Sequence, residues 1–208
     1  MRIFDKLFDS RFERELKRKI STNKNEVERE FKPIGDISLA IIKASHQCFE
    51  TIKPFIDNPN NKEKQQNEIL LFYEFIYFFM HLTNRIAVSD MNSQQFTKLQ
   101  EYIGPIISGA AVDTFFNHWP EDIKSRMNSD FYENLNIAEY EYSKSKEIFS
   151  EKKPYTSDSL FSMLARNVAE LTGSSMNPAT MIAVMGIATK EFSKMQLAEL
   201  IQTASKVL

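Results

Sequence analysis

The chain has 208 residues, of which 42% are hydrophobic and 26% charged, a balance typical of a globular protein that buries a sizeable core. Its formal net charge of −2 provides no overall basic field, which argues against a nucleic-acid partner. A single cysteine excludes an intrachain disulfide and favours a reducing compartment, and Asp5 and Asp9 interrupt the apolar run that a signal peptide requires. We therefore expect a cytoplasmic protein.

Residues 1–20 predict an amphipathic helix. Phe4, Leu7 and Phe8 share one face, and the apolar stripe then spirals round the helix because steps of four residues drift by about 40°. The favoured interpretation is an arm that docks on the domain or on a second subunit. The alternative is a helix that lies on an anionic membrane surface, since seven basic residues accompany four acidic ones.

A polar, charge-rich stretch over residues 21–32 separates this helix from the rest of the chain. Pro33 and Gly35 follow it, and both residue types commonly interrupt regular structure. The sequence thus predicts an N-terminal arm and linker over residues 1–35 and a helical domain over residues 36–208.

The first helix of the domain is expected to begin at Asp36, which is a good N-cap, and to end near Pro54. Ile37, Ile41 and Cys48 recur at helical spacing and define one apolar face. Cys48 lies in the middle of that face, so we predict a buried thiol that reacts slowly.

A helix over about residues 62–89 is expected to form the centre of the fold. Six of the eight residues from 72 to 79 are aromatic, and apolar side chains cover almost the whole circumference of the helix. The apolar run over residues 69–82 has a length typical of a core helix, and Glu74 would be costly in hydrocarbon. We therefore predict a helix buried among other helices, with no transmembrane segment.

One narrow polar stripe interrupts this apolar surface and contains the candidate binding residues Glu74, His81 and Arg85. Spacings of seven and four residues bring them to the same side of the helix. The favoured interpretation is the one wet edge of the helix, and the alternative is a buried polar network with a binding site. Glu74 lies within the aromatic run, so it should need a partner from another helix.

The next helix is expected to start with Ser93 as its cap and to be interrupted at Gly104 and Pro105. A separate apolar helix then follows over residues 106–116. Small side chains in this second helix allow a neighbouring helix to approach closely.

The C-terminal half predicts a long amphipathic helix over residues 123–149 and a further helix capped by Ser157 and ended by Gly173. Asn177, followed by proline, is expected to cap another helix. Residues 181–188 are apolar throughout and predict a second buried helix, and an amphipathic segment ends the chain.

Familiar catalytic motifs are missing from the sequence, including the phosphate-binding loop, the dinucleotide fingerprint and the nucleophile elbow. His118, Glu121 and Asp122 are close in sequence and could be taken for metal ligands. However, Glu121 and Asp122 fall in the first turn of an expected helix, where acidic side chains are favourable without a metal. We therefore expect no catalytic residues, no cofactor and no metal.

The periodicity predicts an all-α single domain of seven or eight helices around the helix at residues 62–89, preceded by the N-terminal arm. The leading functional hypothesis is a non-enzymatic protein that binds an unknown protein or a second copy of itself. A helical enzyme or small-ligand bundle using Glu74, His81 and Arg85 is the first alternative. A peripheral membrane protein using residues 1–20 is the second.

Overall fold

The computed structural model describes residues 27–56, 61–148, 158–174 and 177–208. All regular elements in these ranges are helical, which confirms the predicted all-α class. They are α3 (Val27–Ile52), the short 3₁₀-helix η2 (Lys53–Phe55), α4 (Asn61–Asp90), α5 (Ser93–Phe116), α6 (Glu121–Ser143), α7 (Leu160–Leu171), α8 (Pro178–Met195) and α9 (Leu197–Ser205). The predicted total of seven or eight helices stays a prediction, because residues 1–26 lie outside these ranges.

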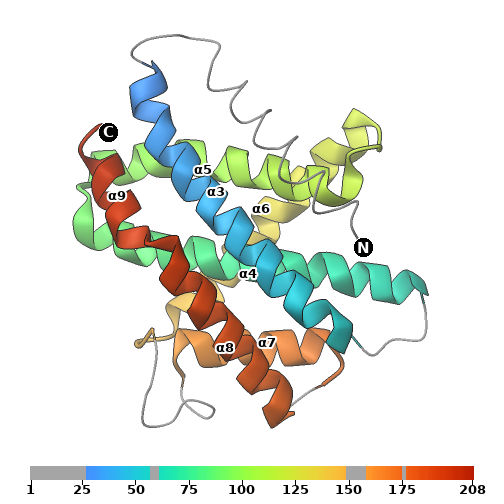
Figure 1. Ribbon diagram of the computed structural model, residues 1–208. Helices are drawn as coiled ribbons and strands as arrows, with labels where there is room; N and C mark the ends of the chain where they lie inside the picture. Colours follow the sequence, from blue (N-terminus) through green and yellow to red (C-terminus); the bar gives the residue numbers. More distant parts are fainter. Residues whose placement is uncertain (1–26, 57–60, 149–157, 175–176) are drawn as a thin grey trace.

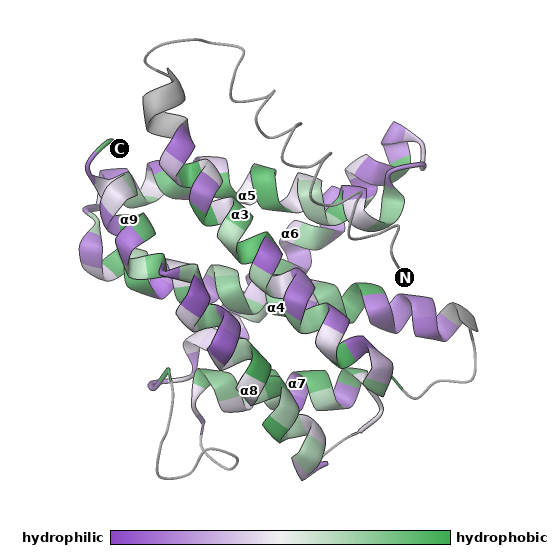
Figure 2. Ribbon diagram, viewed as in Figure 1, coloured by the Kyte–Doolittle hydropathy of each residue, from purple (hydrophilic) through white to green (hydrophobic). Residues whose placement is uncertain are grey.

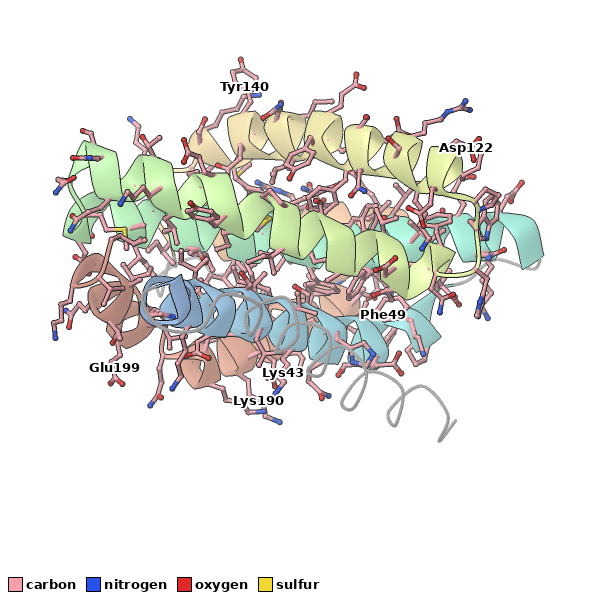
Figure 3. All side chains as sticks on the ribbon, turned by 90° about the horizontal axis from the view of Figure 1, so that it is seen from above. Lys43, Phe49, Asp122, Tyr140, Lys190 and Glu199 are labelled. Carbon is pink, nitrogen blue, oxygen red and sulfur yellow. The ribbon has the colours of Figure 1, made fainter. Side chains whose placement is uncertain are left out.

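Helix α4 packs against α3, α5, α6, α7 and α9 (Figure 1). Residues 63–66, near its start, are polar and exposed, whereas the helix from residue 69 onward is mostly hydrophobic (Figure 2). Phe72, Phe75, Phe78 and Phe79 are all fully buried. Seen from above, α6 covers α4 and α5 on one side, and α3, α8 and α9 lie on the other (Figure 3).

Two predicted interruptions are wrong. Helix α3 continues through Pro33 and past Asp36, so Asp36 is not its N-cap, and α5 continues through Pro105 as one helix. A proline inside a helix costs about 3 kcal/mol. In α5 the apolar face is continuous across the proline, since Ile103 and Ile107 are both buried, and each such side chain contributes about 1.5–3 kcal/mol. Burial on both sides therefore offsets the lost hydrogen bond.

Because α3 runs across residue 35, this position is not a break in secondary structure. The division into an arm over residues 1–35 and a domain over residues 36–208 stays a prediction. The amphipathic helix expected over residues 1–20 lies outside the described ranges. Among the described residues, no helix combines the length and apolar composition that crossing a membrane requires.

Several helix ends differ from the expected ones. Asn92, not Ser93, caps α5, and its side chain accepts hydrogen bonds from two backbone amides in a capping box. Helix α6 ends at Ser143, before the expected residue 149. Ser159, rather than Ser157, caps α7.

Two other local signals are confirmed. Gly173 follows α7 with φ 71°, and the amides of Gly173 and Ser174 donate to the carbonyls of Glu170 and Ala169, respectively. This is the Schellman arrangement, in which glycine favours the left-handed conformation. Asn177 caps α8 and accepts from the amide of Ala179.

Helix α8 is not buried all round, contrary to expectation. Val184 and Ala188 are fully buried, but Ile182 is 48% exposed and Gly186 is exposed as well. The helix packs against α3 and α7, which leaves its remaining side in contact with solvent. An apolar run therefore did not indicate burial on every side.

Gln196 joins α8 to α9 with φ 50°, in the left-handed region that residues with a Cβ avoid. Gln196→Gly should stabilise the fold by about 0.5 kcal/mol, because relief of left-handed strain exceeds the entropy that glycine adds to the unfolded chain. Urea unfolding measures the change. Gln202→Gly within α9 is the matched control and should instead lower the free energy of unfolding by about 1 kcal/mol. An equal loss of stability in both variants would contradict the strain at Gln196.

Cys48 is fully buried, as predicted. Burial, followed by the nearby charge of Glu191, raises the pKa of its thiol well above the ordinary value. We expect a thiol reagent to label the native protein slowly at neutral pH and rapidly in urea. Ser193→Cys, at an exposed position on α8, supplies a fast-reacting control. Labelling of Cys48 as fast as that of the control would contradict the prediction.

Candidate functional site

The polar stripe of α4 faces α6, α7 and the segment that follows α6. Glu74 bonds to side chains of α6 and α7, His81 to a side chain of α6, and Arg85 to backbone carbonyls just after α6. The structure therefore brings the three residues to one side of α4, but each contacts a different set of partners. The interpretation of the stripe as a solvent-exposed edge is wrong for His81, which is only 4% exposed. Glu74 and Arg85 each keep part of their surface exposed.

One carboxylate oxygen of Glu74 accepts two hydrogen bonds. Tyr142 donates its hydroxyl to Oε1 at 2.5 Å, and Asn167 donates its amide to the same oxygen at 2.7 Å. Desolvation raises the pKa of Glu74, and these two hydrogen bonds oppose the shift. The expectation that Glu74 needs a partner from another helix is confirmed, and both of these partners are neutral.

Tyr142 is itself buried and lies against the rings of Phe78 and His81. Burial raises the pKa of Tyr142 well above its ordinary value, and the charge of Glu74 acts in the same direction. The tyrosine therefore stays protonated and serves as a hydrogen-bond donor. Together, Glu74, Tyr142 and Asn167 join α4, α6 and α7 at one point.

A second polar cluster lies further along α4. The Nδ1 atom of His81 is 2.6 Å from Oε2 of Glu139 on α6, whose other oxygen accepts the amide of Asn84 at 2.7 Å. Asn84 in turn accepts the amide of Gln100 on α5 at 2.7 Å. Among the described residues, Nε2 of His81 is buried without a hydrogen-bond partner. The cluster connects α4, α5 and α6.

Arg85 holds the chain where it leaves α6. Its guanidinium donates to the backbone carbonyl of Ser145 at 3.1 Å and to that of Lys146 at 3.4 Å. The hydroxyl of Ser145 also contacts the carbonyls of Glu147 and Asp158, at 2.8 and 2.6 Å. Carbonyls just beyond a helix end lack intrahelical partners, so Arg85 satisfies groups that would otherwise need water.

Sequence reasoning missed Tyr142, Asn167 and Glu139, the partners of the stripe. Glu139 and Tyr142 are three residues apart on one helix, so their side chains share a face, which is a weak local signal. Asn167 lies beside the buried face of α7, next to Val168. Neither signal indicates which residue of α4 lies opposite, because that depends on how the helices cross.

A groove of about 350 Å³ lies between α3 and α8. Leu39, Ala40, Ala44 and Met195 form its apolar part, and Asp36, Lys43, Glu191 and Lys194 supply charged side chains. Neither Glu74, His81 nor Arg85 lines this groove. The groove and the polar stripe are therefore separate features.

Within the described ranges, no group of three or more histidine, cysteine, aspartate or glutamate side chains is arranged to hold a metal ion. His118, Glu121 and Asp122 are all exposed there. No protein-family model, curated protein or solved structure matches this chain.

Proposed function

We propose that this chain is a cytoplasmic, non-enzymatic helical protein that is built around α4 and acts by binding another protein chain. One observation favours protein binding over the binding of a small ligand. Glu74, His81 and Arg85 direct hydrogen-bonding groups at neighbouring parts of the same chain, where they hold α6 and α7 against α4. A binding site would keep such groups for its ligand, whereas here they stabilise the fold.

Exposed apolar side chains support an interaction role. Ile137 and Tyr140 on α6 are 56% and 65% exposed. Neighbouring apolar side chains on a surface are typical of contact sites, and tyrosine is frequent in such sites. The cytoplasmic location rests on the single cysteine, which is buried and has no disulfide partner in the chain.

A small polar ligand bound beside α4 is the second candidate function. It is favoured by the buried Nε2 of His81, which lacks a protein partner among the described residues, and by the raised pKa of Glu74. Native mass spectrometry of the purified protein tests it. A stoichiometric small-molecule adduct that disappears in His81→Phe would favour this candidate over the first.

Co-purification from the native host tests the leading proposal. Two differently tagged copies of the full chain are expressed together, and each is purified through its own tag under gentle conditions. We expect a stoichiometric protein, either the other tagged copy or a different chain, to be recovered. Recovery of the chain alone, at concentrations near its cellular level, would overturn the proposal.

Residues 1–20 provide a separate test, because the membrane alternative depends on them. Flotation with vesicles rich in anionic lipid should leave the full chain in the soluble fraction if the protein-binding proposal is correct. Flotation of the full chain, lost on deletion of residues 1–20, would favour the membrane alternative.

A further inference from the structure

Helix α6 carries two apolar seams on opposite sides. The inner seam consists of Phe131, Leu135, Ala138 and Tyr142, and these side chains are buried or partly buried beneath the helix. The outer seam, which we define as Glu133, Ile137 and Tyr140 together with Lys144, the C-cap residue that follows α6, is exposed at every position. The outer seam is displaced from the inner one by two residues, or about 200° around the helix. Tyr140 accordingly points away from the body of the protein in Figure 3.

The spacing of the outer seam is that of a helix-pairing surface. Its members are four, three and four residues apart, which is the spacing of the a and d positions in a coiled coil. The two apolar members lie in the middle, and the two charged members lie at the ends with opposite signs.

We propose that the outer seam of α6 binds the outer seam of a second copy of this chain, with the two helices antiparallel. This inference rests on the proposed function and names the partner and the surface. A two-fold axis midway between Ile137 and Tyr140 places each of these side chains opposite the other in the second copy. The result is a central apolar contact of four side chains.

Charge favours this arrangement over the parallel one. The same axis places Glu133 of each copy opposite Lys144 of the other, which creates two symmetric ion pairs. Parallel pairing would instead oppose Glu133 to Glu133 and Lys144 to Lys144, and like charges across an interface are unfavourable. Asn136 would face Glu141, so no like charges oppose each other immediately beside the centre.

Lys144 is already positioned at this seam. Its ammonium lies 4.4 Å from the centre of the Tyr140 ring and 2.7 Å from a carboxylate oxygen of Glu141. Both side chains of this ion pair are about half exposed, so the contact with Glu141 is weak and Lys144 can also reach a partner. A contact made by one helix per copy lies at the small end of protein interfaces, and the dimer should therefore dissociate on dilution.

Sedimentation velocity of the full chain over a range of concentrations tests the inference. We expect a reversible monomer–dimer equilibrium that Tyr140→Ala weakens by more than tenfold. Glu133→Lys and Lys144→Glu should each weaken the dimer by about tenfold, because each converts two attractive contacts into repulsive ones. The double variant Glu133→Lys, Lys144→Glu restores opposite charges and should return to within about threefold of the wild type.

Glu199→Lys is the matched control, since it reverses an exposed charge on α9, away from Tyr140 (Figure 3). It should leave the dimerisation constant unchanged. All of the substituted positions are exposed, and circular dichroism checks that each variant keeps its helical content.

The outcomes separate this inference from the proposed function. If the wild type stays monomeric but a different protein co-purifies, the α6 inference is wrong and the proposed function stands. If the wild type dimerises but the charge reversals have no effect, the dimer uses another surface and the inference is likewise wrong. If the wild type stays monomeric and no other protein co-purifies with it, both the α6 inference and the proposed function are wrong.

Discussion

Phe78→Ala should lower the free energy of unfolding by about 3–5 kcal/mol, the largest effect we expect from a single substitution. Phe78 is fully buried, and its ring centre lies 5.0 Å from that of Phe161 on α7 and 5.7 Å from that of Tyr142 on α6. Removing the ring leaves a cavity where three helices meet. It also removes support from the tyrosine that donates to Glu74.

Urea unfolding measures this change. Val88→Ala is the matched control on the same helix, because Val88 is 64% exposed, and it should change stability by less than about 0.5 kcal/mol. A loss at Phe78 no larger than the loss at Val88 would show that α6 and α7 do not pack on α4 as described.

Glu74→Ala should cost about 3 kcal/mol, the second largest effect. The substitution removes the acceptor shared by Tyr142 and Asn167. The buried hydroxyl of Tyr142, left without a partner, costs about 1–3 kcal/mol, and the loss of the Asn167 bond and of the packing of the Glu74 side chain adds to this cost. Glu74→Gln retains an acceptor oxygen for both donors and should cost less than the alanine variant at neutral pH. Equal losses in the two variants would mean that the hydrogen bonds contribute nothing beyond side-chain packing.

The pH dependence of stability distinguishes the wild type from Glu74→Gln in a second way. Because the folded pKa of Glu74 is raised above its ordinary value of 4.5, the folded state binds more protons than the unfolded state above that pH. The stability contributed by this group therefore falls as the pH rises from about 4.5 to the folded pKa. Glutamine does not titrate, so the stability of Glu74→Gln relative to wild type should rise over the same range.

Urea unfolding at several pH values on both sides of 4.5 provides the measurement. Asn167→Ala is the control, because it weakens the same cluster but keeps the carboxyl group, and it should retain the wild-type sign of the pH dependence. Parallel stability curves for wild type and Glu74→Gln would contradict the raised pKa.

Local patterns in the sequence were sufficient for the fold class and for some helix ends. The helical spacing of Ile37, Ile41 and Cys48 predicts a helix with one buried face, and all three side chains are fully buried in α3. Gly173 and Asn177 end and begin helices as expected. These signals can be read from the sequence because each depends on residues within one or two turns of the helix.

Tertiary structure overruled other local signals. Pro105 and Asp36 indicated helix boundaries, yet α5 and α3 continue through them. The local cost of a proline is smaller than the gain from burying apolar side chains on both sides of it, and that gain depends on the neighbouring helices. The sequence alone contains no measure of this second quantity.

The candidate site shows the same division between local and tertiary information. The spacing of Glu74, His81 and Arg85 is enough to predict that they share one side of a helix, because it matches the helical repeat. Their partners are visible only in the folded chain, where Tyr142, 68 positions away, and Asn167, 93 positions away, donate to Glu74. Such partners are chosen by the crossing angles and axial positions of packed helices, which arise from the fit of many side chains at once and leave no periodic trace in the sequence.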